Sequence, residues 1–156
     1  ALMKILLATA CGAKKNKGRM PAIDLYKSSR IKAVNNRRNG ADFAVLSAKY
    51  GLIYPDRVIR DYEKILDPKG IKKLTPQVTE FIKTYDLTVF FKGGSREEYR
   101  NLIKNASEIL NKPLIMIGNR NQEDIGKLEE LLLRCTKGDL DKIDLIAPSI
   151  ETYNLS

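Results

Sequence analysis

The sequence contains no histidine. Histidine is the commonest general base of enzymes and the commonest metal ligand among side chains. Its absence excludes Ser-His-Asp triads, Cys-His pairs and zinc sites built on histidine. Any catalysis must therefore rely on cysteine, lysine, tyrosine, serine or carboxylate side chains, and we expect neither a metal nor a cofactor.

Cysteine and long apolar segments are scarce as well. Cys11 and Cys135 lie far apart in different kinds of segment, which does not indicate a disulfide framework. No apolar run approaches the roughly 18 residues that span a bilayer, and Met3–Ala10 is too short for a secretory signal. We therefore expect a cytoplasmic protein with no membrane partner. Ala1 and Leu2 precede Met3 and are regarded as lying upstream of the natural start.

Short apolar runs alternate with helical patterns along the chain. The runs typical of strands buried on both faces are Met3–Ala10, Phe43–Leu46, Leu87–Phe91 and Leu114–Ile117. Helices are expected over Pro21–Asn39, over Pro68–Tyr85 as one helix kinked near Pro76 or two short ones, over Arg96–Asn111 and over Ile125–Cys135. Ile143–Ala147 is expected to add an edge strand or to pack as a short segment.

This alternation predicts an α/β fold: a three-layer α/β/α sandwich around a mostly parallel, Rossmann-like sheet. The chain has 156 residues, of which 43% are hydrophobic and 30% are charged. That size and composition suffice to bury one core without disulfides. We expect residues 1–156 to form a single domain.

The net charge of +9 is concentrated at one end of the chain. Residues 1–40 contain ten Lys or Arg and a single acidic residue, Asp24, whereas the other 116 residues contain 18 basic and 18 acidic side chains. A one-sided positive field attracts phosphate-rich partners, so the expected partner is a nucleic acid or a phosphorylated nucleoside. The alternative is a solvated basic face of the kind enriched in proteins from hot habitats.

The loop after the first expected strand carries a thiol among cations. Ligands of parallel sheets bind beyond the carboxyl ends of the strands, and here Cys11 and Gly12 are followed by Lys14 and Lys15. Nearby lysines favour a reactive thiolate, and amides beside glycine bind anions. Cys11 is therefore a candidate nucleophile or substrate contact. The alternative, favoured for a lone cysteine without histidine, is a buried packing residue at a strand end.

The loop after the second expected strand carries Ser47, Lys49, Tyr50 and Gly51. These residues place a hydroxyl, an ammonium and a phenol at the sheet edge, where they would bind a phosphate or a base, or where Lys49 would promote proton transfer by Tyr50. The alternative is a turn in which Gly51 supplies a positive φ and Tyr50 packs. The later segments Gly93–Ser95 and Gly118–Gly126 are either anion-binding helix starts or ordinary caps.

Several motifs together resemble a family of uncharacterised α/β domains with the signature LSAKYGLI, which is Leu46–Ile53 here. The other matching segments are Cys11–Lys15, Pro21–Tyr26, Asp61–Tyr62, Gly94 with Tyr99, and Gly118 with Ile125–Gly126. The resemblance covers nearly the whole chain. It implies that Tyr26, Tyr62 and Gly94 belong to the site.

A more distant resemblance is to the core domain of archaeosine synthase, which modifies a deazaguanine base in transfer RNA. Cys11-Gly-Ala-Lys-Lys and Tyr26-Lys-Ser-Ser are similar to its Pro-Cys-Ser-x-x-Lys-Pro-Tyr signature, without the proline before the cysteine and the Pro-Tyr after the lysine. Such domains are similar in architecture to uracil-DNA-glycosylase-like folds. That similarity implies a nucleobase ligand.

We therefore expect a domain that associates with a nucleic acid or nucleobase and modifies the base, as a transferase or glycosylase-like enzyme, in a pocket at the strand ends. The expected catalytic residues are Cys11, Lys49 and Tyr50. The expected substrate-binding residues are Gly12, Lys14, Lys15, Tyr26, Ser47, Gly51, Tyr62 and Gly94. The alternatives are a non-catalytic nucleic-acid-binding module, in which the cations serve affinity alone, and a nucleotide-binding stress-response protein.

Overall fold

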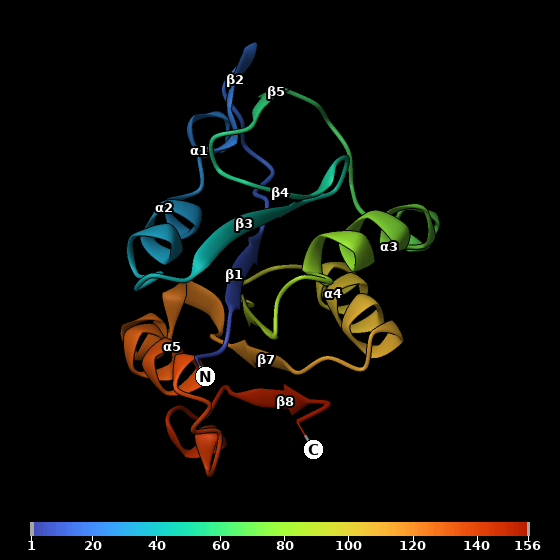
Figure 1. Ribbon diagram of the computed structural model, residues 1–156. Helices are drawn as coiled ribbons and strands as arrows, with labels where there is room; N and C mark the ends of the chain where they lie inside the picture. Colours follow the sequence, from blue (N-terminus) through green and yellow to red (C-terminus); the bar gives the residue numbers. More distant parts are fainter. Residues whose placement is uncertain (1, 156) are drawn as a thin grey trace.

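The chain forms a mixed α/β fold around a six-stranded, mostly parallel sheet (Figure 1). The computed structural model describes residues 2–155. The strand order is β4-β3-β1-β6-β7-β8. The inner strands, which run parallel to one another, are β3 (Asp42–Ser47), β1 (Ile5–Ala10), β6 (Leu87–Phe91) and β7 (Leu114–Ile117). The edge strands, β4 (Gly51–Ile53) and β8 (Glu151–Tyr153), are antiparallel to their neighbours.

The inner strands confirm the four strands predicted from the sequence. Every residue of β1, β6 and β7 is buried. Leu7 of β1 lies in register between Phe43 of β3 and Val89 of β6. A strand with neighbours on both sides and side chains packed on both faces needs apolar residues throughout, which is why these runs are continuous rather than alternating.

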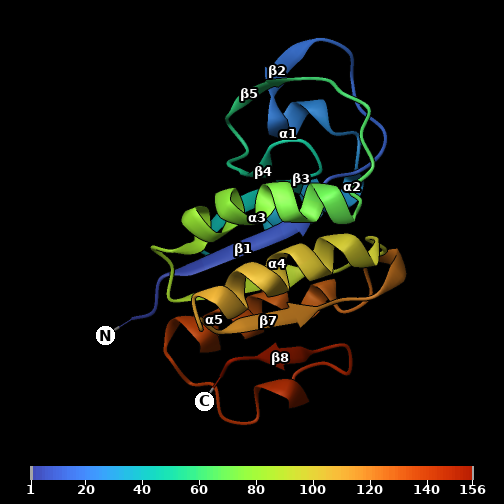
Figure 2. The same cartoon turned by 90° about the vertical axis from the view of Figure 1, so that its right-hand side faces the viewer.

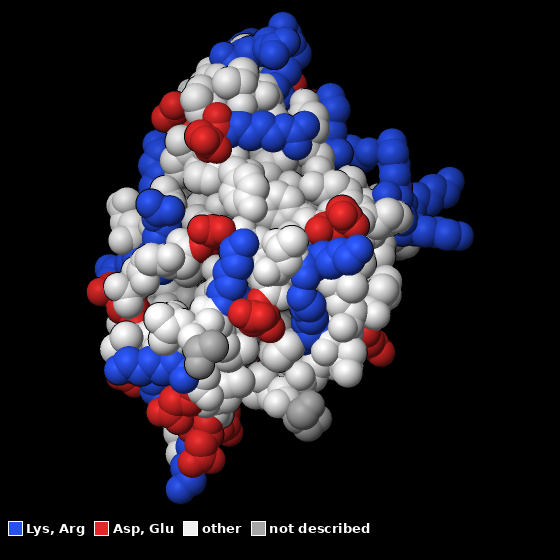
Figure 3. Space-filling model, in the orientation of Figure 1, with Lys and Arg blue, Asp and Glu red and all other residues white. Residues whose placement is uncertain are grey.

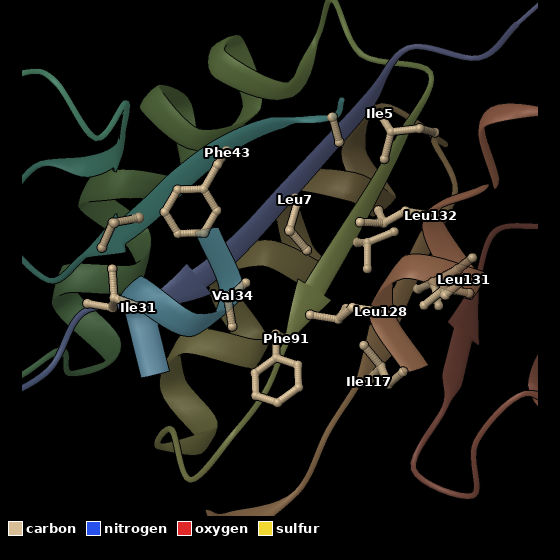
Figure 4. Close-up of a cluster of buried hydrophobic side chains, with 14 of the residues drawn as sticks. Ile5, Leu7, Ile31, Val34, Phe43, Phe91, Ile117, Leu128, Leu131 and Leu132 are labelled. Carbon is tan, nitrogen blue, oxygen red and sulfur yellow. The ribbon is translucent and has the colours of Figure 1, made fainter. Parts of the chain in front are cut away.

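Two hydrophobic cores lie on opposite faces of the sheet, because successive side chains of a strand point to opposite faces. Leu7 packs into the core formed with α2 (Ser29–Asn36) and α5 (Leu128–Thr136), which Figure 4 shows around Phe43 and Phe91. Leu6 packs into the core formed with α3 (Pro68–Ile82) and α4 (Glu97–Ile109). These two helices lie side by side in front of the sheet in Figure 2. No helix within residues 2–155 is long and apolar enough to cross a membrane.

The single helix predicted over Pro21–Asn39 is wrong. The chain forms α1 (Ala22–Leu25) and α2, separated by Tyr26, whose extended backbone makes a β-bridge with Lys15. The break turns the Tyr26 ring into the interior, where it is fully buried. Ser28 then starts the second helix by accepting a hydrogen bond from the Ile31 N–H.

The other predicted helices are close to those observed. α3 is one continuous helix with Pro76 inside it, capped by Asp67, which accepts a hydrogen bond from the Gly70 N–H at 2.7 Å. Short 3-10 turns, η1 (Arg120–Gln122) and η2 (Ile125–Lys127), precede α5. Of the two expectations for Ile143–Ala147, the short packed segment is confirmed as the 3-10 turn η3 (Ile143–Leu145). The edge strand comes instead from β8.

Three short strands lie in segments expected to be loops. β4 follows β3 after a tight turn. β2 (Arg19–Pro21) and β5 (Val58–Arg60) pair antiparallel in a separate two-stranded sheet. Together with α1 they project beyond β4 at one end of the molecule (Figure 1). Strands of three residues are too short to show a period in the sequence.

Candidate functional site

The strand order creates a crevice between the carboxyl ends of β1 and β6. The chain leaves β1 for β3 on one side of it, and after β3 it crosses to β6 on the other side. The segments that follow β1 and β6 therefore diverge. In open parallel sheets this reversal of direction is where ligands bind.

A pocket of about 280 Å³ lies at this crevice and is called the β1–β6 pocket below. Its walls come from the segment after β1, from α2, from the segment before α3, and from the turn and helix after β6. The lining residues are Cys11, Gly12, Ala13, Lys15, Arg30, Lys64, Ile65, Gly94, Ser95, Arg96 and Tyr99. Four of these described residues are cationic and none is acidic, so the pocket favours an anionic ligand.

Arg30 spans the crevice from α2. Its Nη2 donates to the carbonyl oxygen of Ala10, the last residue of β1, at 2.7 Å. On the other side it passes Gly93, which follows β6 with a φ of +53°, and a Cβ there would lie 2.5 Å from the Arg30 Cδ. The missing side chain of Gly93 therefore makes room for the guanidinium.

Two buried polar atoms of residues that line the pocket have no hydrogen-bond partner among residues 2–155. They are Nε of Arg30 and Oγ of Ser95. Buried polar groups are nearly always hydrogen-bonded in native proteins, to the chain, to water or to a ligand. Their position suits a ligand with acceptor oxygens.

Cys11 lies where β1 ends. Its N–H donates to the Leu46 carbonyl oxygen at 2.9 Å, which ties it to β3. Its Sγ lies 3.3 Å from the Tyr99 hydroxyl, with which it shares a hydrogen bond. Burial lowers the pKa of Arg30, while the nearby Cys11 and Tyr99 act in the opposite direction. The thiol therefore faces a phenol and a guanidinium.

The tyrosines around the thiol remain neutral. Burial, followed by the proximity of Cys11, raises the pKa of Tyr26 to about 12. The same two causes raise the pKa of Tyr62 and of Tyr99 well above the ordinary value. At neutral pH these phenols are hydrogen-bond donors, and none is a base.

A hydrogen-bonded set of three hydroxyls lies next to the thiol. The Tyr62 hydroxyl lies 2.7 Å from the Ser47 Oγ and 2.8 Å from the Tyr26 hydroxyl. Lys15 covers the set, with its Nζ 4.3 Å from the centre of the Tyr62 ring. Ser47 also accepts hydrogen bonds from the N–H groups of Lys49 and Tyr50. Its hydroxyl therefore holds the turn after β3.

The remaining predicted site residues lie outside the β1–β6 pocket. Lys49 is exposed, with its Nζ 5.3 Å from the centre of the Tyr50 ring. Gly51 has a φ of +75°, and a Cβ there would lie 2.0 Å from Oε1 of Gln77. Lys14 is exposed, and its carbonyl accepts a hydrogen bond from the Lys27 N–H. The expected turn with a positive φ at Gly51 is thus observed.

The cations of residues 1–40 are not all directed at the site. Lys15 and Arg30 line the β1–β6 pocket, whereas Lys4 lies over the Tyr85 ring and Arg37 pairs with Glu129. Figure 3 shows the face at which β1 begins, where basic and acidic side chains interleave except over the end that carries β2 and β5. The pocket draws half of its cations, Lys64 and Arg96, from outside residues 1–40.

Residues 5–118 match a family described as Family of unknown function (DUF6884). The chain belongs to DUF6884. No significant match is found among curated proteins or among solved structures. The DUF6884 region contains every lining residue of the β1–β6 pocket, while α5 and β8 lie outside it.

Sequence reasoning missed Arg30, Lys64, Ser95 and Arg96, and it named Tyr99 only through a family resemblance. Ser95 and Arg96 follow the glycine pair after β6, a signal that the sequence does carry. Arg30 and Lys64 have no such signal. Their place in the pocket depends on how α2 and the segment before α3 pack.

Proposed function

We propose that the chain binds one nucleotide unit of a nucleic acid in the β1–β6 pocket and modifies its base, as a transferase or glycosylase-like enzyme. The observation that carries this proposal is a concave site at the strand-order reversal, walled by four cations and by none of the described carboxylates. Cationic, neutral-donor surroundings are suited to a phosphate with a base beside it. A volume of about 280 Å³ restricts the ligand to one such unit.

Cys11 is the group proposed to act on the base. A thiolate is a strong nucleophile, and a neighbouring guanidinium stabilises its charge. Arg30 supplies that guanidinium, and the Tyr99 phenol donates to the sulfur. Lys49 and Tyr50 lie outside the pocket, so their proposed catalytic role passes to Arg30 and Tyr99 as groups that position and charge the thiol.

The finer fold assignment belongs to the same proposal. We infer a three-layer α/β/α sandwich of Rossmann-like or uracil-DNA-glycosylase-like type. The parallel order β3-β1-β6-β7 and the two cores on opposite faces of the sheet support it. Fold alone does not specify activity.

A second candidate is a non-catalytic nucleic-acid-binding module. Cys11 is half-buried and packs against both hydrophobic cores, which is how a packing cysteine behaves. In that case the cations provide affinity and the thiol does no chemistry. The two functions differ only in what Cys11 does.

Alkylation of the thiol by iodoacetamide tests the binding site. Cys135 is an internal control, because it is fully buried and burial raises its pKa to about 12. We expect Cys11 to react first, and nucleoside 5′-monophosphates to slow that reaction. The double variant Lys64→Ala, Arg96→Ala should lose this protection at the same nucleotide concentration. Unprotected alkylation in the unaltered chain at millimolar nucleotide would contradict the proposal.

Mass spectrometry separates the enzyme from the binding module. The chain is incubated with single-stranded RNA and DNA, and the masses of protein and bases are followed. Base release, a changed base or a protein adduct that disappears in Cys11→Ser supports the enzyme. Binding that is unchanged in Cys11→Ser, with no altered mass, favours the module.

A further inference from the structure

Two more hollows lie along the carboxyl-terminal edge of the sheet beside the β1–β6 pocket. The middle hollow, of about 560 Å³, lies between the glycine pair after β6 and the residues after β7. The outer hollow, of about 400 Å³, lies between α4, the ends of β6 and β7, and β8. The middle hollow shares Gly94 and Ser95 with the β1–β6 pocket, and it shares Gly93, Arg100 and Asn119 with the outer hollow. The three are therefore contiguous.

Uncompensated positive charge continues along these hollows. The middle hollow contains Arg100 and Arg120 with Glu123, and the outer hollow adds Lys104 with Glu97. The remaining pair of the outer hollow is internally neutralised, because the Lys92 Nζ lies 2.7 Å from the Glu151 Oε1. Arg100 is oriented toward the glycine turn, since its Nη1 donates to the Ser95 carbonyl oxygen at 3.0 Å. Three cations against two carboxylates thus extend the cationic wall of the β1–β6 pocket.

The ridge between the hollows is low and offers backbone donors. Gly94 is exposed, and a Cβ on it would meet only the Arg120 Cγ, at 3.9 Å. α4 begins immediately afterwards without a capping side chain at Arg96, so its first N–H groups are unpaired by the chain. Glycine turns that lead into a helix start allow the close approach of phosphates. Glu97 and Glu98 in the first turn limit this attraction to ligands that also contact the cations.

We infer that the three hollows form one track for a single-stranded nucleic acid. The β1–β6 pocket takes one nucleotide, and the middle and outer hollows take the phosphates of the nucleotides that follow. This inference rests on the proposed function. A single strand is required because the β1–β6 pocket admits one unit, whose base must be unstacked to enter it. β8, which closes the outer hollow, lies outside the DUF6884 region, so this end of the track is a feature of the present chain.

Salt-dependent binding tests the track. The probes are a nucleoside 5′-monophosphate, single-stranded RNA and DNA homopolymers of increasing length, and the matching duplexes. The variant Lys104→Ala, Arg120→Ala removes one exposed cation from each of the two added hollows. The matched control Arg38→Ala, Lys137→Ala removes the same charge from the exposed surface beyond the carboxyl ends of α2 and α5. Mononucleotide binding is measured in all three proteins.

We expect single strands to bind more tightly than the monophosphate, with a steeper dependence of log affinity on log salt. The Lys104→Ala, Arg120→Ala variant should reduce that slope by about 2 while leaving monophosphate binding unchanged, since each lost phosphate contact removes about 1. The control should retain the slope to within about half a contact.

Other outcomes overturn the inference in distinct ways. Equal affinity and slope for monophosphate and long strands would remove the track and leave the proposed function standing. Equal effects of the variant and its control, or tighter binding of duplex than of single strand, would also overturn the track. If neither monophosphate nor strand binds, the proposed function falls with it.

Discussion

Tyr62 joins two loops that leave different strands. Its hydroxyl contacts Ser47 at the end of β3 and Tyr26 at the end of α1. Its ring packs edge-on against the rings of Tyr26 and Tyr50, with centroids 6.4 and 5.7 Å apart. The wall next to Cys11 therefore depends on one phenolic oxygen.

Replacing Tyr62 by phenylalanine should lower the free energy of unfolding by about 1–2 kcal/mol, because it leaves two buried hydroxyls with one partner fewer. Tyr50→Phe is the matched control, since no hydrogen bond of its hydroxyl is found within residues 2–155. That variant should change stability by less than about 0.5 kcal/mol. Urea denaturation measures both, and equal losses in the two variants would show that the hydroxyl set contributes nothing.

The residues that line the pocket and were anticipated from the sequence are those next to a strand. Cys11, Gly12 and Lys15 follow β1, and Gly94 follows β6, so an apolar run that stops at a glycine was enough to place them. Arg30 lies inside a helix, where a cation is ordinarily solvated. It enters the pocket because α2 packs across the end of β1 and Gly93 leaves space. Such tertiary placement leaves no trace in local sequence.

At the scale of elements, the short edge strand β4 is held by a side chain. Nε2 of Gln77, in α3, donates to the Leu52 carbonyl oxygen at 2.8 Å, and its Oε1 accepts from the Leu52 N–H at 2.8 Å. The amide thus takes the place of a further strand at this buried edge. The fit is tight, because Gly51 leaves no room for a Cβ beside Gln77.

Gln77→Ala should cost about 1–3 kcal/mol, since it leaves a buried donor and a buried acceptor of Leu52 without partners. Gln77→Glu keeps the acceptor for the Leu52 N–H and loses the donor, so we expect a smaller loss. Urea denaturation gives the stability, and hydrogen exchange of the Leu52 amide reports on the edge itself. Unaltered exchange at Leu52 in Gln77→Ala would show that the strand is held by β3 alone.

The long elements could be predicted because their burial is uniform or periodic. β6 and β7 coincide with the predicted runs, and α3 and α4 with the predicted helical spacing. The elements that could not be predicted are held by distant contacts. β4 depends on Gln77, β2 on β5, and β8 on β7 and on the Lys92–Glu151 ion pair. Tyr26 interrupts a predicted helix for the same reason, because its ring is buried against Tyr62.

At the scale of the whole molecule, the phenols form a store of pH-dependent stability. Burial is the largest cause in every case: it raises the pKa of Tyr26 to about 12 and raises those of Tyr62, Tyr85, Tyr99 and Tyr153 above the ordinary value. In the unfolded chain a tyrosine titrates near pH 10. The folded state therefore holds these protons more tightly than the unfolded state does.

Stability should accordingly be unaffected by these groups below pH 10 and should fall as the pH rises from 10 toward 12. For Tyr26 alone the loss is about 2 kcal/mol at pH 12, and the other phenols add to it. Because native domains are stable by only about 5–15 kcal/mol, we expect unfolding within this range. Phenolate absorbance and circular dichroism should change together, and Tyr26→Phe should make the decline less steep. Phenols that ionise near pH 10 while the circular dichroism stays native would contradict their burial.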